Sequence, residues 1–310
     1  SRIMDLQQQL SKTNASKNSI ITIGVFDGVH LGHLHLIERL KNTAIQKKYD
    51  SGIITFTNHP AEILNPKFKP SFIMNFKQKI LALEKTGVDF VVPITFNQTI
   101  SNMSSLEFIE ALQKNLNMKG LVVGPDFAMG KNREATALQL KSLGLEKGFL
   151  TEIIEPQKID GLELRSTAIR EFLLSGNVAE ASKVLGRNFS LSGTVIHGEK
   201  RGRELGFPTA NLKNTNDSAV PKNGIYATFA YIDDRKFMSA TSIGINPTFA
   251  GDAKTIETYI FNFNKDIYGQ AIEVEFIERL RDEIKFTSIE SLIAQMNTDM
   301  IEVEKILKNQ

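Results

Sequence analysis

The chain has 310 residues, of which 41% are hydrophobic and 23% charged, with a net charge of +2 and no cysteine. That length suffices for two domains, and the composition is that of a globular protein. The nearly balanced charge gives no reason to expect a nucleic-acid or membrane partner, and no obligatory protein partner is evident. The missing cysteines exclude disulfides and thiolate chemistry. Without an 18-residue apolar span or a signal-peptide pattern, we expect a cytoplasmic protein.

The first half of the chain alternates apolar, strand-like runs with segments of helical period. Ser104 and Glu107 have the spacing of a capping box at the start of one such segment. This alternation predicts a doubly wound, Rossmann-like parallel sheet, in which ligands bind at the carboxyl ends of the strands. The expected strands are Ile20–Phe26, Gly52–Phe56, Asp89–Ile94, Gly120–Gly124 and Leu150–Ile154, and the expected helices are Leu34–Tyr49, Phe76–Lys85 and Ser104–Asn117.

The pattern changes after a helical pair at Thr167–Leu174 and Val178–Leu185. From residue 190 to 277, strand signals and turns follow one another with almost no helical period, which predicts a small antiparallel β-barrel. A helical pattern from Ile289 to Leu307 closes the chain. We therefore expect an α/β domain at residues 1–185 and a β domain at residues 186–310. The expected barrel strands are Leu191–His197, Ile225–Ile232, Phe237–Ile243, Ile256–Phe263 and Ile272–Ile277.

The most informative motif, Gly-Val-Phe-Asp-Gly-Val-His-Leu-Gly-His at residues 24–33, follows the first expected strand. Its glycine turn leads into a helix, and the N-terminus of a helix favours phosphate. His30 and His33 add donors on one side, which suits nucleotidyl transfer. The stretch has neither the dinucleotide-binding Gly-x-Gly-x-x-Gly nor a Gly-Lys-Ser/Thr loop. The alternatives are a plain turn with solvated histidines and a zinc site that includes His35, although no suitable carboxylate or cysteine accompanies it.

Three further segments are expected at the carboxyl ends of strands in the same sheet. Residues 55–60 (Thr-Phe-Thr-Asn-His-Pro) turn on a proline, and residues 124–133 (Gly-Pro-Asp-Phe-Ala-Met-Gly-Lys-Asn-Arg) offer an acid, an aromatic ring and two cations. Ser166 and Thr167 are expected to begin a helix. Their hydroxyl and N–H groups either cap that helix or bind a phosphate, and Arg170 lies one turn further on, near enough to reach the same anion. A core position for Phe127 and a solvated loop for the two cations are the alternatives.

The second half of the chain carries a basic glycine-rich loop at residues 198–206, followed by Pro-Thr-Ala-Asn, which we interpret as a rigid turn. Thr209 and Asn211 offer neutral oxygens, which suit Mg²⁺ when nucleotide phosphates balance its charge. A polar hairpin is the alternative.

Glu257 has an unusual place in its expected strand, because alternation puts it on one face with Tyr259 and Phe261. A carboxylate is costly to bury among aromatic rings without a partner or a use. Burial would raise its pKa toward that of a general base. A salt-bridged glutamate at the sheet edge is the alternative.

These motifs together resemble the bacterial bifunctional riboflavin kinase/FMN adenylyltransferase family, also called FAD synthetases, over roughly residues 18–308. The resemblance implies an enzyme that uses ATP twice. The carboxy-terminal domain would convert riboflavin to FMN with Mg²⁺, and the amino-terminal domain would convert FMN to FAD and release pyrophosphate. The substrates ATP, riboflavin and FMN are then the expected partners, and FMN is expected to leave one site and rebind at the other. The rivals are a chain with one working activity and a flavin-binding protein without turnover.

The resemblance also implies a role for each matching residue. His30 and His33 would stabilise the transition state of adenylyl transfer, and Glu257 would be the base that activates a ribityl hydroxyl of riboflavin. The implied adenylyltransferase residues are Gly24, Phe26, Asp27, Gly28, His30, Gly32, His33, Ser166, Thr167 and Arg170 for ATP, and Asn58, His59, Pro60, Asp126 and Phe127 for the flavin. The implied kinase residues are Gly198, Lys200, Gly202, Arg203, Gly206, Pro208, Thr209 and Asn211 for ATP, Thr209 and Asn211 for Mg²⁺, and Glu257 and Arg281 for the flavin.

Three positions have alternatives or depart from the family pattern. A solvated cation is the alternative for Arg281. Arg165 stands where the family usually has a serine, and Glu134 stands where its loop usually has a glycine. The negative charge of Glu134 predicts weaker phosphate affinity or a change in loop mobility. Of the two activities, we therefore expect the adenylyltransferase to be the one that is reduced, if either is.

Overall fold

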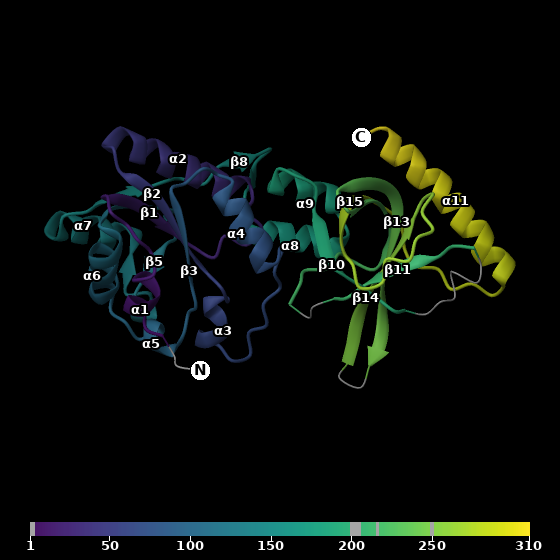
Figure 1. The fold of residues 1–310 in the computed structure, drawn as a ribbon, viewed down its shortest axis with the longest axis horizontal. Coiled ribbons are helices and arrows are strands. Elements are labelled where there is room, and N and C mark those ends of the chain that lie inside the picture. The colour runs from purple at the N-terminus through teal and green to yellow at the C-terminus, as the bar shows by residue number, and fades with distance from the viewer. Residues whose placement is uncertain (1–3, 199–205, 215–216, 249–250) are drawn as a thin grey trace. The chain divides into compact units, whose positions relative to one another are not determined.

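The computed structural model describes residues 4–198, 206–214, 217–248 and 251–310. Its internal contacts divide the chain into two compact units (Figure 1). The first comprises the chain up to Pro70 together with Asn75–Arg165, and the second comprises Ser71–Met74 together with Ser166–Gln310. The domain boundary expected between residues 185 and 186 stays a prediction.

The first unit is built on a parallel sheet whose strands lie in the order β3-β2-β1-β4-β7. The order reverses at β1, and in doubly wound sheets such a point is where ligands bind. The expected Rossmann-like sheet is therefore confirmed. Its strands are β1 (Ser19–Ile23), β2 (Asp50–Phe56), β3 (Phe90–Ile94), β4 (Met118–Val123) and β7 (Leu150–Ile153). They are nearly continuous apolar runs because helices cover both faces of the sheet.

Alternate residues of β1 face two different helical layers. Ile21 and Ile23 belong to the core formed with α1 (Leu6–Leu10), α6 (Ser105–Leu116) and α7 (Ala137–Lys147), whereas Ile20 is buried on the side of α2 (Leu31–Lys47). The capping box expected at α6 is confirmed, because the Ser104 hydroxyl accepts a hydrogen bond from the Glu107 N–H at 3.1 Å. The smaller elements of this unit are α3 (Pro60–Leu64), α4 (Phe76–Glu84), α5 (Gln98–Ser101), a 3₁₀ turn (Lys131–Arg133) and the hairpins β5 (Ala128–Met129) with β6 (Ala135–Thr136) and β8 (Lys158–Ile159) with β9 (Leu162–Glu163).

The second unit begins with α8 (Ser166–Ser175) and α9 (Val178–Leu185) and continues into a closed antiparallel barrel. The strands follow the order β10-β11-β14-β13-β12-β15, which confirms the expected small barrel and its terminal helix, α11 (Ile289–Lys308). They are β10 (Ser190–Ile196), β11 (Thr209–Leu212), β12 (Gly224–Ile232), β13 (Arg235–Thr248), β14 (Gly251–Ile260) and β15 (Ala271–Arg281). The expectation of a turn at Thr209–Asn211 is wrong, because these residues form β11 and pair with β14.

Hydroxyl groups fill part of the barrel interior. Thr228 contacts Ser239 at 2.7 Å and Thr241 at 2.8 Å, and Thr241 contacts Thr258 at 3.0 Å, each between side-chain oxygens. All four residues are fully buried, so the hydroxyls satisfy one another. On the opposite face of β12, Ala227 and Phe229 pack against Val303 and Leu307 of α11. The helix therefore covers the outside of the barrel.

Candidate functional site

The turn between β1 and α2 adopts a strained path. Gly28 has a φ of 88°, but Phe26 and Val29 also have positive φ values, 52° and 42°. A β-branched residue rarely adopts this conformation, and such strain collects at functional sites. Gly32 is required for space, because a Cβ atom there would lie 2.6 Å from the Leu164 carbonyl oxygen.

The histidines at the start of α2 cap the helix in a reciprocal manner. The His30 Nδ1 accepts a hydrogen bond from the His33 N–H, and the His33 Nδ1 accepts one from the His30 N–H, both at 3.2 Å. The rings stack with centroids 3.5 Å apart and planes inclined by 17°. Because each Nδ1 accepts, each neutral ring carries its proton on Nε2. The pair thus places two Nε2–H donors at a helix N-terminus, where an anion is favoured.

The segment after β2 is held by its own hydrogen bonds. The Asn58 amide donates to the Phe96 carbonyl and accepts from the Phe96 N–H, both at 2.9 Å. His59 is the N-cap of α3, since its Nδ1 accepts from the Ala61 N–H at 3.1 Å, and Pro60 occupies the first helical position. These side chains therefore fix the shape of the loop at the end of β2, and their contact with a flavin stays a prediction.

Both departures from the family pattern have local partners. The Glu134 carboxylate accepts a hydrogen bond from the Ser105 N–H at the start of α6, at 2.5 Å. Arg165 forms ion pairs with Glu163 at 2.5 Å and with Asp126 at 3.5 Å. The charges of Glu134 and Arg165 are thus balanced by a helix N-terminus and by carboxylates.

Phe127 is half-buried and packs against the core of the first unit, and its contact with a flavin stays a prediction. Ser166 and Thr167 begin α8, but the β8–β9 hairpin separates that helix from the end of β7. The Arg170 Nε donates to the Ser71 carbonyl oxygen at 2.7 Å, and Ser71 and Arg170 both belong to the second unit. That the residues of α8 join the histidine pair stays a prediction.

A cavity of about 300 Å³ lies in the second unit between barrel strands and α11. Glu257, Tyr259 and Arg281 line it from the strands, and Met296 and Asp299 line it from the helix. The expected alternation of β14 is observed, because Ile256, Thr258 and Ile260 are buried whereas Glu257 is half-buried at the cavity. A carboxylate and an aromatic ring therefore share one wall of an otherwise largely apolar space.

The register of the barrel brings the metal-ligand and base candidates together. Asn211 of β11 pairs directly with Glu257 of β14, and Thr209 pairs with Tyr259. Directly opposed residues in antiparallel strands share one face and have Cβ atoms about 4.5–5.5 Å apart. Two segments 46 residues apart in the sequence (257 minus 211) thus form one polar surface.

A second cavity, of about 460 Å³, adjoins the same strands. Pro208, Asn211 and Gly198 line it, and Thr209 lines both cavities. A Cβ atom at Gly198 would lie 2.2 Å from the Asn211 side chain, so a larger residue there would displace Asn211. Gly206, with a φ of 85°, precedes this segment, whereas Lys200, Gly202 and Arg203 lie outside the described residues.

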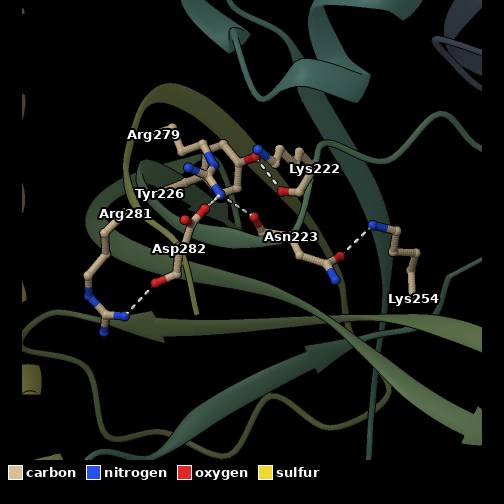
Figure 2. Close-up of polar contacts among 7 residues, drawn as sticks. All are labelled: Lys222, Asn223, Tyr226, Lys254, Arg279, Arg281 and Asp282. Atoms are coloured by element: carbon tan, nitrogen blue, oxygen red, sulfur yellow. Dashed lines mark hydrogen bonds and ion pairs between the residues drawn. The ribbon is translucent and has the colours of Figure 1, made fainter. Parts of the chain in front are cut away.

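Arg281 is neither solvated nor isolated, because α11 supplies its partner. The Arg281 guanidinium binds the Asp299 carboxylate through two hydrogen bonds, at 2.9 and 2.6 Å. It also donates to the Asp282 carbonyl at 2.8 Å, while the Asp282 carboxylate binds Arg279 (Figure 2). The hydrogen bond from Arg279 holds the pKa of Asp282 below its usual value. The end of β15 is thereby fixed beside the cavity.

The comparisons with known proteins agree with this arrangement. A sequence model of the FAD synthetase family matches residues 12–168, and one of the riboflavin kinase family matches residues 185–307. A relative from Listeria monocytogenes, called bifunctional riboflavin kinase/FMN adenylyltransferase, is 35% identical over 91% of this chain and 90% of its own length. A relative of the same name from Escherichia coli K12 is 33% identical over 90% of each chain. The chain belongs to this family.

A solved structure also resembles this member of the riboflavin kinase/FMN adenylyltransferase family. It comes from Streptococcus pneumoniae, is described as a macrolide-efflux protein, and is 31% identical with a TM-score of 0.88 over 96% of this chain and 97% of its own. In the described part of this family member, no helix has the length and apolar character needed to cross a membrane.

Two residues of this family member gain importance only in the structure. Asp299 contacts Arg281 at the cavity, and its place on the apolar face of the terminal helix was the signal available in the sequence. Lys79 is buried beneath the turn that carries the histidine pair. No sequence signal marked it, because its partners are backbone carbonyl groups.

Proposed function

We propose that the protein phosphorylates riboflavin to FMN at the barrel and adenylylates FMN to FAD at the histidine turn. We assign the adenylyltransferase to residues 1–185 and the kinase to residues 186–310. The observation that carries the kinase assignment is the direct pairing of Asn211 with Glu257. A general base and a possible metal ligand on one face, with Thr209 bordering both cavities, suit phosphoryl transfer between two small molecules.

In the kinase reaction, the Glu257 carboxylate takes the proton of a ribityl hydroxyl. The hydroxyl oxygen then attacks the γ-phosphorus of ATP, and the bond to ADP breaks. The cavity beneath α11 would hold the flavin, because its walls combine aromatic and aliphatic groups with a few polar ones. The second cavity would hold the nucleotide.

Thr209 and Asn211 fit a Mg²⁺ ion that arrives with the nucleotide. Both offer neutral oxygens on one face of β11, and the described residues contain no group of three or more His, Asp or Glu placed to hold a metal by themselves. An ion held here would need the charge of the phosphates, and it would neutralise charge on the transferred group.

In the adenylyltransferase reaction, an oxygen of the FMN phosphate attacks the α-phosphorus of ATP, and pyrophosphate leaves. The stacked histidines donate Nε2–H hydrogen bonds to the phosphates, and the N-terminus of α2 adds partial positive charge. The reaction needs no covalent intermediate, so positioning and charge stabilisation account for the catalysis.

The test is a time course with the purified full chain, riboflavin, ATP and Mg²⁺, in which the flavins are separated by chromatography. We expect FMN first and FAD second. FMN accumulation without FAD, also when FMN is the substrate, would contradict the adenylyltransferase assignment. Flavin binding without ATP consumption would contradict both assignments and favour a carrier.

The remaining partner assignments are part of the same proposal. We propose that the protein acts in the cytoplasm on small molecules, without a nucleic-acid, membrane or obligatory protein partner. The modest net charge of +2 supports the part of this proposal that concerns nucleic-acid and membrane partners.

A further inference from the structure

Lys79 occupies a position that an ordinary core residue would fill at lower cost. It lies in the first turns of α4 with 5% of its surface exposed. Its ammonium group donates to the Val25 and Phe56 carbonyl oxygens, each at 2.8 Å. Burying an ammonium group is costly, and a cation near a helix N-terminus is opposed by the helix dipole. Packing of α4 against the sheet therefore does not account for a lysine here.

The two carbonyl groups belong to the two segments that carry the candidate adenylyltransferase residues. Val25 lies in the turn before α2, and Phe56 is the last residue of β2. The Val25 carbonyl also accepts a hydrogen bond from the Thr55 hydroxyl at 3.0 Å. Hydrogen bonds from β2 and α4 to the Val25 carbonyl therefore hold the turn next to Phe26, the residue that adopts the left-handed conformation.

A second buried charge lies in the same turn. Asp27 is 4% exposed, and its charge acts on Lys79. Burial lowers the pKa of Lys79 to about 8, and the attraction of Asp27 partly opposes that fall. The positive charge of the ammonium and the negative charge of the carboxylate offset one another, whereas either charge alone would be costly to bury.

We propose that Lys79 is a positioning residue of the adenylyltransferase, which sets the turn before α2 against the loop after β2. This inference rests on the proposed conversion of FMN to FAD. The first segment presents the histidine pair to the nucleotide, and the second leads into the loop assigned to the flavin. Lys79 touches neither reacting group, and it acts through the two carbonyl oxygens.

The role has a kinetic signature. Misplacing one substrate relative to the other by about 1 Å lowers the rate about 100-fold. Loss of Lys79 would therefore raise KM for both FMN and ATP and lower kcat in adenylyl transfer. A residue needed for folding alone would instead lower the active fraction and leave both KM values unchanged.

The test compares Lys79→Met with the wild type and with Lys77→Met, which changes an exposed lysine on the same helix. Conversion of FMN to FAD and of riboflavin to FMN are measured on each full-length protein. We expect Lys79→Met to lose about 100-fold in kcat/KM for FAD formation, with higher KM values, and to keep its kinase activity. Lys77→Met should match the wild type.

Lys79→Gln keeps a neutral donor with two N–H groups and serves if the methionine variant fails to fold. We expect its KM values to lie between those of the wild type and Lys79→Met. Normal KM values in both variants would overturn the role of Lys79, as would a loss of kcat alone. If the wild type makes no FAD from FMN, the proposed function fails instead, whatever the variants do.

Discussion

His33 combines two duties at the scale of a single residue, since it caps α2 and stacks on His30. We expect His33→Ala to lower FAD formation about 10²–10³-fold, as for other single donors that stabilise developing charge, and to spare FMN formation. His33→Gln separates the duties, because glutamine at this helix position preserves a capping box. It should keep the stability of the first unit and still lose activity. A parallel loss of FMN formation in either variant would contradict separate sites.

Substitution of Glu257 tests the kinase assignment of the barrel in the same way. Glu257→Gln keeps the size of the side chain and removes the base, so we expect riboflavin phosphorylation to fall about 10²–10⁴-fold. FAD formation from supplied FMN should continue at the wild-type rate. Glu278→Gln, an exposed change on β15, is the control. Undiminished phosphorylation in Glu257→Gln would exclude this residue as the base.

The lowered pKa of Lys79 predicts that the stability of the chain depends on pH. Its pKa is about 8 in the folded chain against an ordinary value of 10.5 for lysine, so the unfolded chain binds more protons between these pH values. The free energy of unfolding therefore rises with pH in this window, and the cost of the buried charge is largest below it. Between about pH 7.5 and 9.5, we expect the rise in wild type to exceed that in Lys79→Met by about 1–2 kcal/mol, measured by urea unfolding. Equal slopes would contradict the lowered pKa.

At the scale of elements, α11 is tied to the barrel by the buried Asp299 carboxylate, which also accepts from Gln295 at 2.9 Å. Asp299→Ala leaves Arg281 without its ionic partner. We expect a loss of roughly 2–3 kcal/mol in stability and a higher KM for riboflavin. Glu302→Ala, an exposed change on the same helix, should alter neither. Wild-type KM values in Asp299→Ala would show that this contact does not shape the cavity.

The sequence predicted those elements whose pattern is strong. The parallel strands were located by their apolar runs, but β1 ends at Ile23, three residues before the expected end, because Phe26 has a positive φ. Helix α7 was missed because it contains Gly144, which is required where a Cβ atom would lie 2.2 Å from the Phe149 carbonyl. Strand β11 was mistaken for a turn because proline, threonine and asparagine are common in turns. Its partner, β14, lies far along the chain.

At the scale of the whole molecule, the sequence motifs identified the family, but they did not predict the hydrogen bonds that hold the site residues in place. Asn58 bonds to the backbone of Phe96, 38 residues away, and Lys79 bonds to carbonyl groups, which leave no mark in a sequence. Arg281 was expected at the flavin site, and its partner on α11 was not. Each of these contacts depends on the tertiary fold, so residue types and spacing predicted the chemistry better than the geometry that supports it.

We propose two separate sites linked by FMN that passes through solution, and mixing two variants that are each impaired at one site tests this most directly. From riboflavin, His33→Ala should make FMN but about 10²–10³-fold less FAD than the wild type, and Glu257→Gln should make little of either flavin because its phosphorylation falls about 10²–10⁴-fold. Mixed together with riboflavin, ATP and Mg²⁺, they should form FAD after a lag, because FMN released by the first is adenylylated by the second. FMN that accumulates in the mixture without FAD would contradict independent sites linked by free FMN.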